Sequence, residues 1–181
     1  MSRKLRWLVV LLVLAALPFT GQAHRLDEYL QATIVAIDPT EIRLQMNLTP
    51  GVEVADQVLA RIDRDHDGVI STKEANAYSR SLARDMTLRL DHHKLPLKIT
   101  RVNFPQLTEL RTGWGIIQIE LCATVRPLAA GPHRLTLQNR HLPGISVFLF
   151  NAAQPKSASV RITAQKRNEN QSSGEIEFTV D

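Results

Sequence analysis

Oxygen-bearing side chains recur at alternate positions in the stretch from Asp63 to Glu74, which reads DRDHDGVISTKE. Asp63, Asp65 and Asp67 fall at positions 1, 3 and 5 of a twelve-residue loop, and Glu74 falls at position 12. Alternate residues of a tight loop point inward, and Ca²⁺ is a hard cation that takes six to eight oxygen ligands at about 2.3–2.6 Å. The spacing therefore predicts a calcium site.

The other oxygens of such a site come from three further positions. Val69 would offer its main-chain carbonyl, Ser71 a hydroxyl or a bridging water, and Glu74 both carboxylate oxygens. The complete predicted metal-ligand set is Asp63, Asp65, Asp67, Val69, Ser71 and Glu74.

The remaining loop residues fit the same interpretation. Gly68 has no Cβ and accepts the positive φ of the sharp turn. The side chains of Arg64 and His66 would point into solvent, whereas Ile70 is apolar and needs a packing partner. Since the sequence contains no second aspartate-rich loop, Ile70 must pack on the β-domain, on a second copy of the chain, or nowhere. We expect the first, because both flanking helices also carry apolar faces that need a surface.

Two alternatives compete with this hypothesis. Asp and Gly are common in turns, so the stretch could be an acidic surface turn that binds no ion. Ser71 and Glu74 also have the spacing of a helix capping box. Both roles coexist only if Glu74 gives its carboxylate to the ion and leaves the cap to Ser71 or Thr72.

Apolar residues flank the loop with a helical period. Those before it are Val54, Val58, Leu59 and Ile62, and those after it are Ala75, Tyr78 and Leu82. With these flanks, the stretch from Val52 to Arg84 resembles the EF-hand family, and every ligand position matches. The resemblance implies a helix–loop–helix over about residues 52–84 that holds one Ca²⁺.

Outside this insert the apolar period is two. The predicted strands cover residues 29–37, 42–48, 86–90, 95–99, 106–112, 116–125, 133–138, 145–150, 160–165 and 175–180. Many short strands separated by turn residues indicate an antiparallel, β-sandwich-like domain. We therefore expect a mainly β fold of the α+β class, in which residues 24–181 form one β-rich domain with a helical insert between its second and third strands.

The first 23 residues have the layout of a secretory signal peptide, with Arg3, Lys4 and Arg6 before an apolar run and Ala23 at the expected cleavage site. An uncleaved anchor is the alternative. We expect export to the periplasm or secretion, with no transmembrane segment in residues 24–181. Three of the 22 basic residues lie in the signal, so the remainder carries 19 basic against 18 acidic residues, and nucleic acid is not an expected partner.

Catalytic motifs are missing from the sequence, which has no nucleophile elbow, phosphate loop, dinucleotide fingerprint or zinc-protease helix. Cys122 is the single cysteine, so no intrachain disulfide is available, and its apolar neighbours predict a buried position. We therefore expect a protein that is not an enzyme.

Cleavage after Ala23 would make His24 the first residue of the mature chain. A terminal amine together with its own imidazole can chelate copper or nickel, and another histidine could complete the site. The candidates are His92, His93, His133 and His141. Solvated histidines without a metal are the alternative.

The segment from Ala23 to Leu30, followed by a β-rich domain, resembles the periplasmic amino-terminal portion of membrane proteins related to hydrogenase and urease nickel-accessory transporters. The resemblance implies at most a soluble periplasmic counterpart of these proteins. Docking of a membrane partner through an exposed sheet edge or an apolar helix face is a separate hypothesis. Membrane helices do not follow in this sequence, so transport is not implied. The expected function is calcium binding with a structural role, and the alternatives are copper or nickel handling through His24 and an interaction module.

Overall fold

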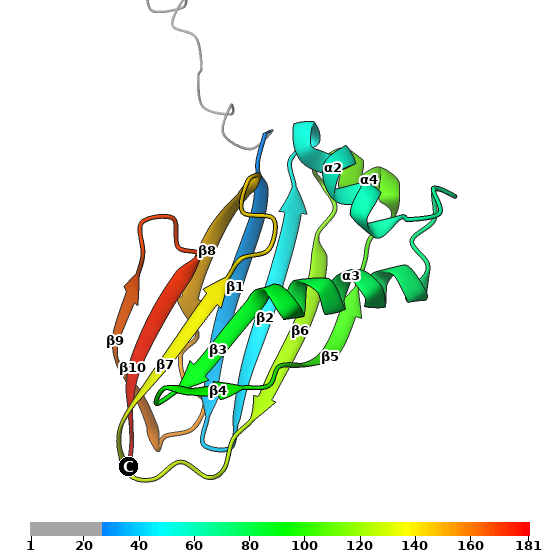
Figure 1. Cartoon of the computed structure of the whole chain (residues 1–181). Helices are drawn as coiled ribbons and strands as arrows, with labels where there is room; N and C mark the ends of the chain where they lie inside the picture. Colours follow the sequence, from blue (N-terminus) through cyan, green and yellow to red (C-terminus); the bar gives the residue numbers. More distant parts are fainter. Residues whose placement is uncertain (1–26) are drawn as a thin grey trace, which may run out of the picture.

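The computed structural model describes residues 27–181, which fold into two five-stranded β-sheets and three helices (Figure 1). The predicted signal peptide, residues 1–23, and His24 lie outside the described residues. The strands are β1 Tyr29–Asp38, β2 Glu41–Pro50, β3 Met86–Leu90, β4 His93–Leu95, β5 Lys98–Asn103, β6 Ile117–Thr124, β7 Gly131–Asn139, β8 Ser146–Ala152, β9 Val160–Arg167 and β10 Ser173–Val180. The helices are α2 Val52–Ile62, α3 Thr72–Asp85 and α4 Leu107–Arg111.

The first sheet has the strand order β5-β6-β2-β1-β8. Its centre is the predicted hairpin, in which Tyr29 lies opposite Pro50 and Asp38 opposite Glu41. All its pairs are antiparallel except that of β1 with β8, which run parallel with Tyr29 beside Ser146. The expectation of antiparallel sheets is therefore correct for every other pair and wrong for this one.

The second sheet has the order β4-β3-β7-β10-β9, and all its pairs are antiparallel. Side chains alternate between buried and exposed along β1 and β2, as the period of two predicts. One apolar cluster unites the inner faces of the two sheets, and it includes Leu44 and Met46 from β2, Leu137 from β7 and Ile176 from β10. The mainly β, sandwich-like fold with a helical insert is thus confirmed.

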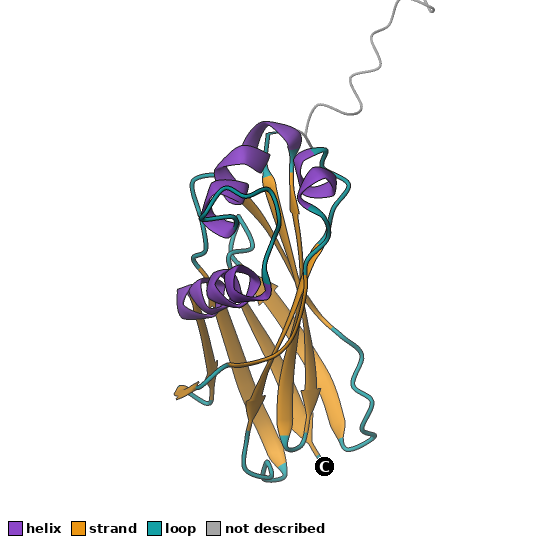
Figure 2. Cartoon of the chain, turned by 90° about the vertical axis from the view of Figure 1, so that its right-hand side faces the viewer, coloured by secondary structure: helices purple, strands orange, loops and turns teal. Residues whose placement is uncertain are grey.

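Helices α2 and α4 lie together at one end of the sheets, and α3 runs across the strands of the first sheet (Figure 1 and Figure 2). Helices α2 and α3 follow one another between β2 and β3, where the insert was expected, and α3 lies close to β5. Their buried faces contain the apolar residues of the helical pattern, including Val58 and Ile62 in α2 and Leu82 in α3. Hydrophobic burial therefore fixes both helices beside the loop that joins them.

The strand predicted at residues 106–112 is wrong, because the chain forms α4 there. Leu107 and Leu110 are both buried, which is a spacing of about one helical turn, and Glu109 Oε2 accepts from the N–H of Gln106 at 3.0 Å at the start of the helix. This helix packs beside α2, where an ion pair joins Arg111 to Asp56 at 3.0 Å.

The strand predicted at residues 95–99 is divided between the two sheets. β4 ends at Leu95 in the second sheet, and β5 begins at Lys98 in the first. Pro96 lies between them and has no N–H for a strand ladder, so the chain leaves one sheet there and joins the other. Cys122 in β6 is buried and free, as predicted.

Candidate metal centre

The ends of α2 and α3 define the loop that carries the aspartates. Helix α2 ends at Ile62, and the N–H of Asp63 still donates to the carbonyl of Leu59 at 2.9 Å. Helix α3 begins after Ser71, whose hydroxyl accepts from the N–H of Glu74. The loop therefore connects two helix termini, and its first carboxylate, Asp63, directly follows the last turn of α2.

Three carboxylates converge in this loop. One oxygen each from Asp63, Asp65 and Asp67 lies within 4.8 Å of the others. Asp65 and Asp67 are exposed, whereas Asp63 is buried, with only 6% of its surface accessible. Within residues 27–181 this is the only group of three or more His, Cys, Asp or Glu side chains close enough to hold a metal ion.

Main-chain N–H groups hold these carboxylates in place. Asp63 Oδ2 accepts from Gly68 at 3.2 Å, Asp65 Oδ1 accepts from Asp67 at 3.3 Å, and Asp67 Oδ1 accepts from Val69 at 2.7 Å. Gly68 has φ of +83°, the left-handed conformation that the sequence predicted for it. Main-chain N–H groups of the loop thus orient all three carboxylates.

One buried oxygen of the cluster has no hydrogen-bond partner among the described residues. Oδ1 of Asp63 is buried and makes no hydrogen bond within the described part of the chain. A buried oxygen of a charged group is costly when it is left unpaired, by about 1–3 kcal/mol or more. The other oxygen of this carboxylate is bonded to Gly68, so the free Oδ1 is the acceptor that a cation would satisfy.

Glu74 is not a member of the three-carboxylate cluster. Its Oε1 accepts from the N–H of Arg64 at 2.7 Å, and its Oε2 accepts from the hydroxyl and N–H of Ser71 at 2.7 and 3.0 Å. Hydrogen bonds from the Ser71 hydroxyl and the N–H of Arg64 lower the pKa of Glu74 to about 2. The capping box is therefore complete, and Ser71 and Glu74 bind one another across the start of α3.

The outward-facing residues lie as predicted. Arg64 and His66 are exposed, and Ile70 is partly buried against the apolar cluster of its own chain. Val69 has an exposed side chain, which agrees with a residue that would contribute only its main-chain carbonyl. Ile70 therefore needs no second loop to cover it.

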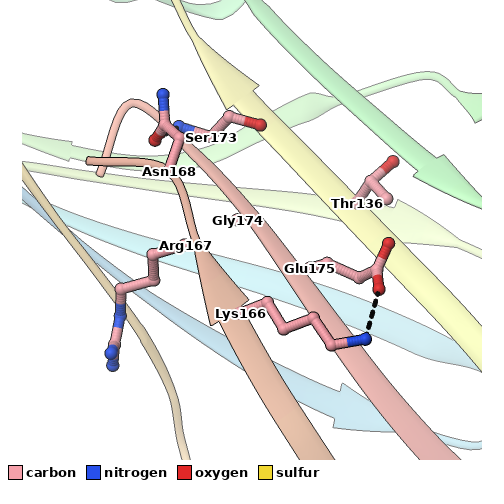
Figure 3. A pocket seen from close by; sticks show the side chains of 7 residues that line it. All are labelled: Thr136, Lys166, Arg167, Asn168, Ser173, Gly174 and Glu175. Carbon is pink, nitrogen blue, oxygen red and sulfur yellow. Dashed lines mark hydrogen bonds and ion pairs between the residues drawn. The ribbon is translucent and has the colours of Figure 1, made fainter. Parts of the chain in front are cut away.

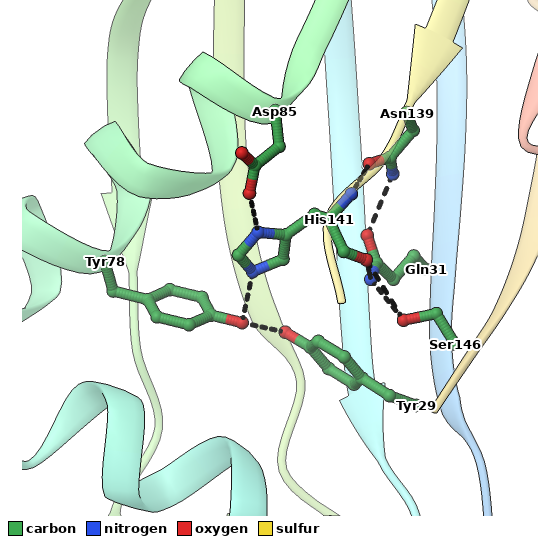
Figure 4. A network of polar contacts seen from close by, with 7 residues as sticks. All are labelled: Tyr29, Gln31, Tyr78, Asp85, Asn139, His141 and Ser146. Carbon is green, nitrogen blue, oxygen red and sulfur yellow. Dashed lines mark hydrogen bonds and ion pairs between the residues drawn. The ribbon is translucent and has the colours of Figure 1, made fainter. Parts of the chain in front are cut away.

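A buried polar network lies beside the helices, and the sequence pattern did not predict it (Figure 4). The hydroxyls of Tyr29 and Tyr78 are 2.7 Å apart, and Tyr78 Oη is 3.0 Å from Nε2 of His141. Nδ1 of His141 is 2.7 Å from Oδ2 of Asp85. Since an ionised carboxylate only accepts, Nδ1 of His141 carries the proton, and Nε2 accepts from Tyr78.

The network continues through Gln31, which joins β1 to the connection after β7 (Figure 4). Its side-chain nitrogen donates to the His141 carbonyl and to Ser146 at 2.8 and 2.7 Å, and its oxygen accepts from Asn139. Burial raises the pKa of both tyrosines and lowers that of His141. Phenols and imidazole are therefore all neutral at pH 7, so the network carries Asp85 as its single charge.

The histidines proposed as copper or nickel ligands do not form a cluster within the described residues. His92 and His93 are exposed at the β3–β4 turn. His133 pairs with Asp91 at 2.7 Å, and His141 belongs to the buried network. The expectation for His24 itself falls outside the described residues.

A hollow of about 200 Å³ lies over the second sheet, lined by residues of β7, β9 and β10 and the β9–β10 turn (Figure 3). Lys166 Nζ is already 3.5 Å from Glu175 Oε1 and 2.6 Å from Glu177 Oε1. The Arg167 guanidinium, which also lines the hollow, donates to the Phe150 carbonyl and to Asn151 Oδ1, so both cations of the hollow already have partners.

The chain matches no known protein-family model and no curated protein. Across residues 27–181, none of the helices combines the length and the apolar character that crossing a membrane requires.

Proposed function

We propose that this chain is an exported calcium-binding β-domain whose EF-hand-like loop, Asp63–Glu74, holds one Ca²⁺ in a structural role. The observation that carries the proposal is the buried Oδ1 of Asp63, which has no hydrogen-bond partner although it belongs to a cluster of three carboxylates. Cations satisfy such oxygens, and three carboxylates within 4.8 Å repel one another until a cation neutralises them.

The donor set favours calcium over softer metals. The loop offers carboxylate oxygens, the Val69 carbonyl and the Ser71 hydroxyl, and it contains no thiol. Glu74 would complete the set by exchanging the hydrogen bonds of its capping box for the ion, while the Ser71 hydroxyl keeps the cap on α3. The exposed Asp65 and Asp67 leave room for water ligands, which Ca²⁺ tolerates.

A structural role follows from the surroundings of the loop. Ile70 packs on its own domain, and within residues 27–181 there is no second carboxylate cluster to pair with the first. Sensor proteins open a groove between paired helices on calcium binding. Here both α2 and α3 bury their apolar faces in the core, so the ion would fasten the two helices together at their shared loop.

Calcium titration of the purified protein tests the proposal. We expect saturable binding at one ion per chain, and a gain of about 2.7 kcal/mol in unfolding free energy at a hundredfold excess over Kd. The variant Asp63→Asn with Asp65→Asn should lose both effects. The control Glu53→Gln with Asp56→Asn removes the same charge from the neighbouring exposed face of α2 and should retain them.

Two results would contradict the proposal. One is an unfolding temperature that is the same in millimolar calcium and in chelator, and the other is equal calcium affinity in the two double variants. A parallel titration with Mg²⁺ measures selectivity, because Mg²⁺ demands a nearly ideal octahedral site.

Export is part of the same proposal. Amino-terminal sequencing of the protein recovered from its native compartment should begin at His24, whereas recovery with Met1 or Ser2 would contradict cleavage after Ala23.

A further inference from the structure

A second candidate site lies beside the buried polar network. A cavity of about 260 Å³ is enclosed by the end of α2, the second half of α3 and the connection after β7. Tyr78, Asp85 and His141 of the buried network form one wall of it (Figure 4). Arg61 and Arg64 line it from the α2 side, and Ser81 lines it from α3.

The charges around this cavity do not balance. Arg61 and Arg64 supply two positive charges against the single negative charge of Asp85, and His141 is neutral at pH 7 because burial lowers its pKa. Within residues 27–181, no carboxylate lies in ion-pair distance of either guanidinium. Asp85 itself is engaged by His141 at 2.7 Å. Two guanidinium groups therefore remain available to an anion.

Some hydrogen-bond donors that line the cavity are already engaged, and others are free. The Tyr78 hydroxyl donates to Nε2 of His141 and accepts from Tyr29, so its proton is already used. The Ser81 hydroxyl makes no hydrogen bond to any described residue. The free donors are consequently the two guanidinium groups and this hydroxyl, and all three suit an oxygen acceptor.

We propose that this cavity binds a small oxyanion, a carboxylate or a phosphate group. Guanidinium groups present paired N–H donors that match the oxygens of either group, and charge-assisted bonds of this kind are about twice as strong as neutral ones. The volume is just below the roughly 300 Å³ at which pockets for larger organic ligands begin. The ligand is therefore of the size of free phosphate, a dicarboxylate or the anionic end of a longer molecule.

Isothermal titration of the metal-free protein with inorganic phosphate and, separately, with succinate tests this proposal. The buffer is low in chloride and is freed of metal on a chelating resin, because a soluble polycarboxylate chelator would compete for the site. Leaving calcium out also separates this experiment from the test of the metal loop.

Arg61→Gln with Arg64→Gln should weaken binding of the preferred anion at least about tenfold, because each exchange removes a charge-assisted hydrogen bond. The control Arg80→Gln with Arg84→Gln removes the same charge from exposed positions of α3 that do not line the cavity, and it should change affinity less than about twofold. Amide shifts of Ser81 and Leu142 in NMR spectra should follow the titration. Phosphate binding alone identifies a phosphate site, and succinate binding alone identifies a carboxylate site.

The proposal is overturned if neither anion binds at millimolar concentration, or if the two double variants lose affinity equally. Shifts confined to residues far from the cavity would also overturn it, since they would place the anion elsewhere on the surface.

Discussion

Nδ1 of His141 lies 2.7 Å from Oδ2 of Asp85, so a hydrogen bond ties the end of α3 to the connection after β7. The imidazole is buried and the carboxylate is partly exposed. Burial lowers the pKa of His141 and outweighs the opposing effect of Asp85. Protonation therefore favours the unfolded chain, in which this imidazole has its ordinary pKa of about 6.5.

The first prediction follows from the lowered pKa of His141. The contribution of His141 to stability is fully present above about pH 6.5 and is lost as the pH falls through the pKa of the folded state. Urea denaturation at pH 7.5 and pH 5.5 should show a loss of stability in acid that is smaller in His141→Gln. An unchanged pH dependence in this variant would contradict the assignment.

The pKa of His133 is shifted in the opposite direction to that of His141, so its effect on the pH dependence of stability is also opposite. Burial opposes its charge, but hydrogen bonds to the Ala129 carbonyl and to Asp91 together raise its pKa. Its contribution is present below about pH 6.5 and disappears as the pH rises through the raised pKa. Stability should therefore fall more steeply with acid in His133→Gln than in the parent protein, and less steeply in His141→Gln. An equal pH dependence of the unfolding free energy in the two variants would contradict these opposite assignments.

The second prediction concerns Tyr78. Tyr78→Phe keeps the ring and its edge contact with Phe104 but removes the hydroxyl that joins Tyr29 to His141. Two buried polar groups then lose their partner, so we expect a loss of about 1–3 kcal/mol in unfolding free energy. Urea denaturation of the single variants Tyr78→Phe and Tyr29→Phe, and of the double variant, measures it.

The double variant provides the control for this prediction. Once Tyr78 is phenylalanine, removing the Tyr29 hydroxyl also removes an unpaired buried group, so the two losses should not add. Full additivity would mean that the two hydroxyls do not interact.

The third prediction isolates the turn in the aspartate loop. Gly68 has φ of +83°, and a Cβ there would meet no atom within 4 Å. Gly68→Ala should therefore cost about 1–2 kcal/mol through backbone strain alone, without steric clash. Gly144→Ala is the matched control, because its Cβ is equally free and its φ is not positive. Equal thermal stability of the two variants would contradict this explanation.

The fourth prediction concerns the contact between the two sheets at Gly174. A Cβ on this β10 residue would lie 2.3 Å from ring carbons of Phe150 in β8. Gly174→Ala should cost roughly 1–3 kcal/mol through overpacking, as urea denaturation would show. Phe150→Leu should cost less stability in the Gly174→Ala variant than in the parent protein, because the smaller side chain relieves the clash. Purely additive losses would rule out the clash.

The sequence was sufficient for elements whose signal is local. The hairpin of β1 and β2 follows from alternation around the turn at Pro39, and α2 and α3 follow from apolar residues at helical spacing. The convergence of Asp63, Asp65 and Asp67 follows from their positions in one short loop. These features depend on neighbours in the chain, so one sequence contains the information.

Other features depend on partners distant in the chain. The bonds from Tyr78 to Tyr29 and His141 span 49 and 63 residues, and the parallel pairing of β1 with β8 is similarly remote. No local pattern encodes such contacts. The short helix α4 is a different case, since its five residues are too few to show a helical period and Gln106 is not a usual N-cap residue.

Arg64 belongs to both proposed sites through different parts of one residue. Its N–H holds Oε1 of Glu74 at 2.7 Å, and its side chain lines the cavity beside Tyr78. An ion that drew Glu74 out of this bond would free the N–H of the same residue that carries the guanidinium. Because thermodynamic linkage is reciprocal, calcium would alter oxyanion affinity by the same factor by which the oxyanion alters calcium affinity. Arg64 would thereby couple the occupancy of the calcium loop to the affinity of the cavity for an oxyanion.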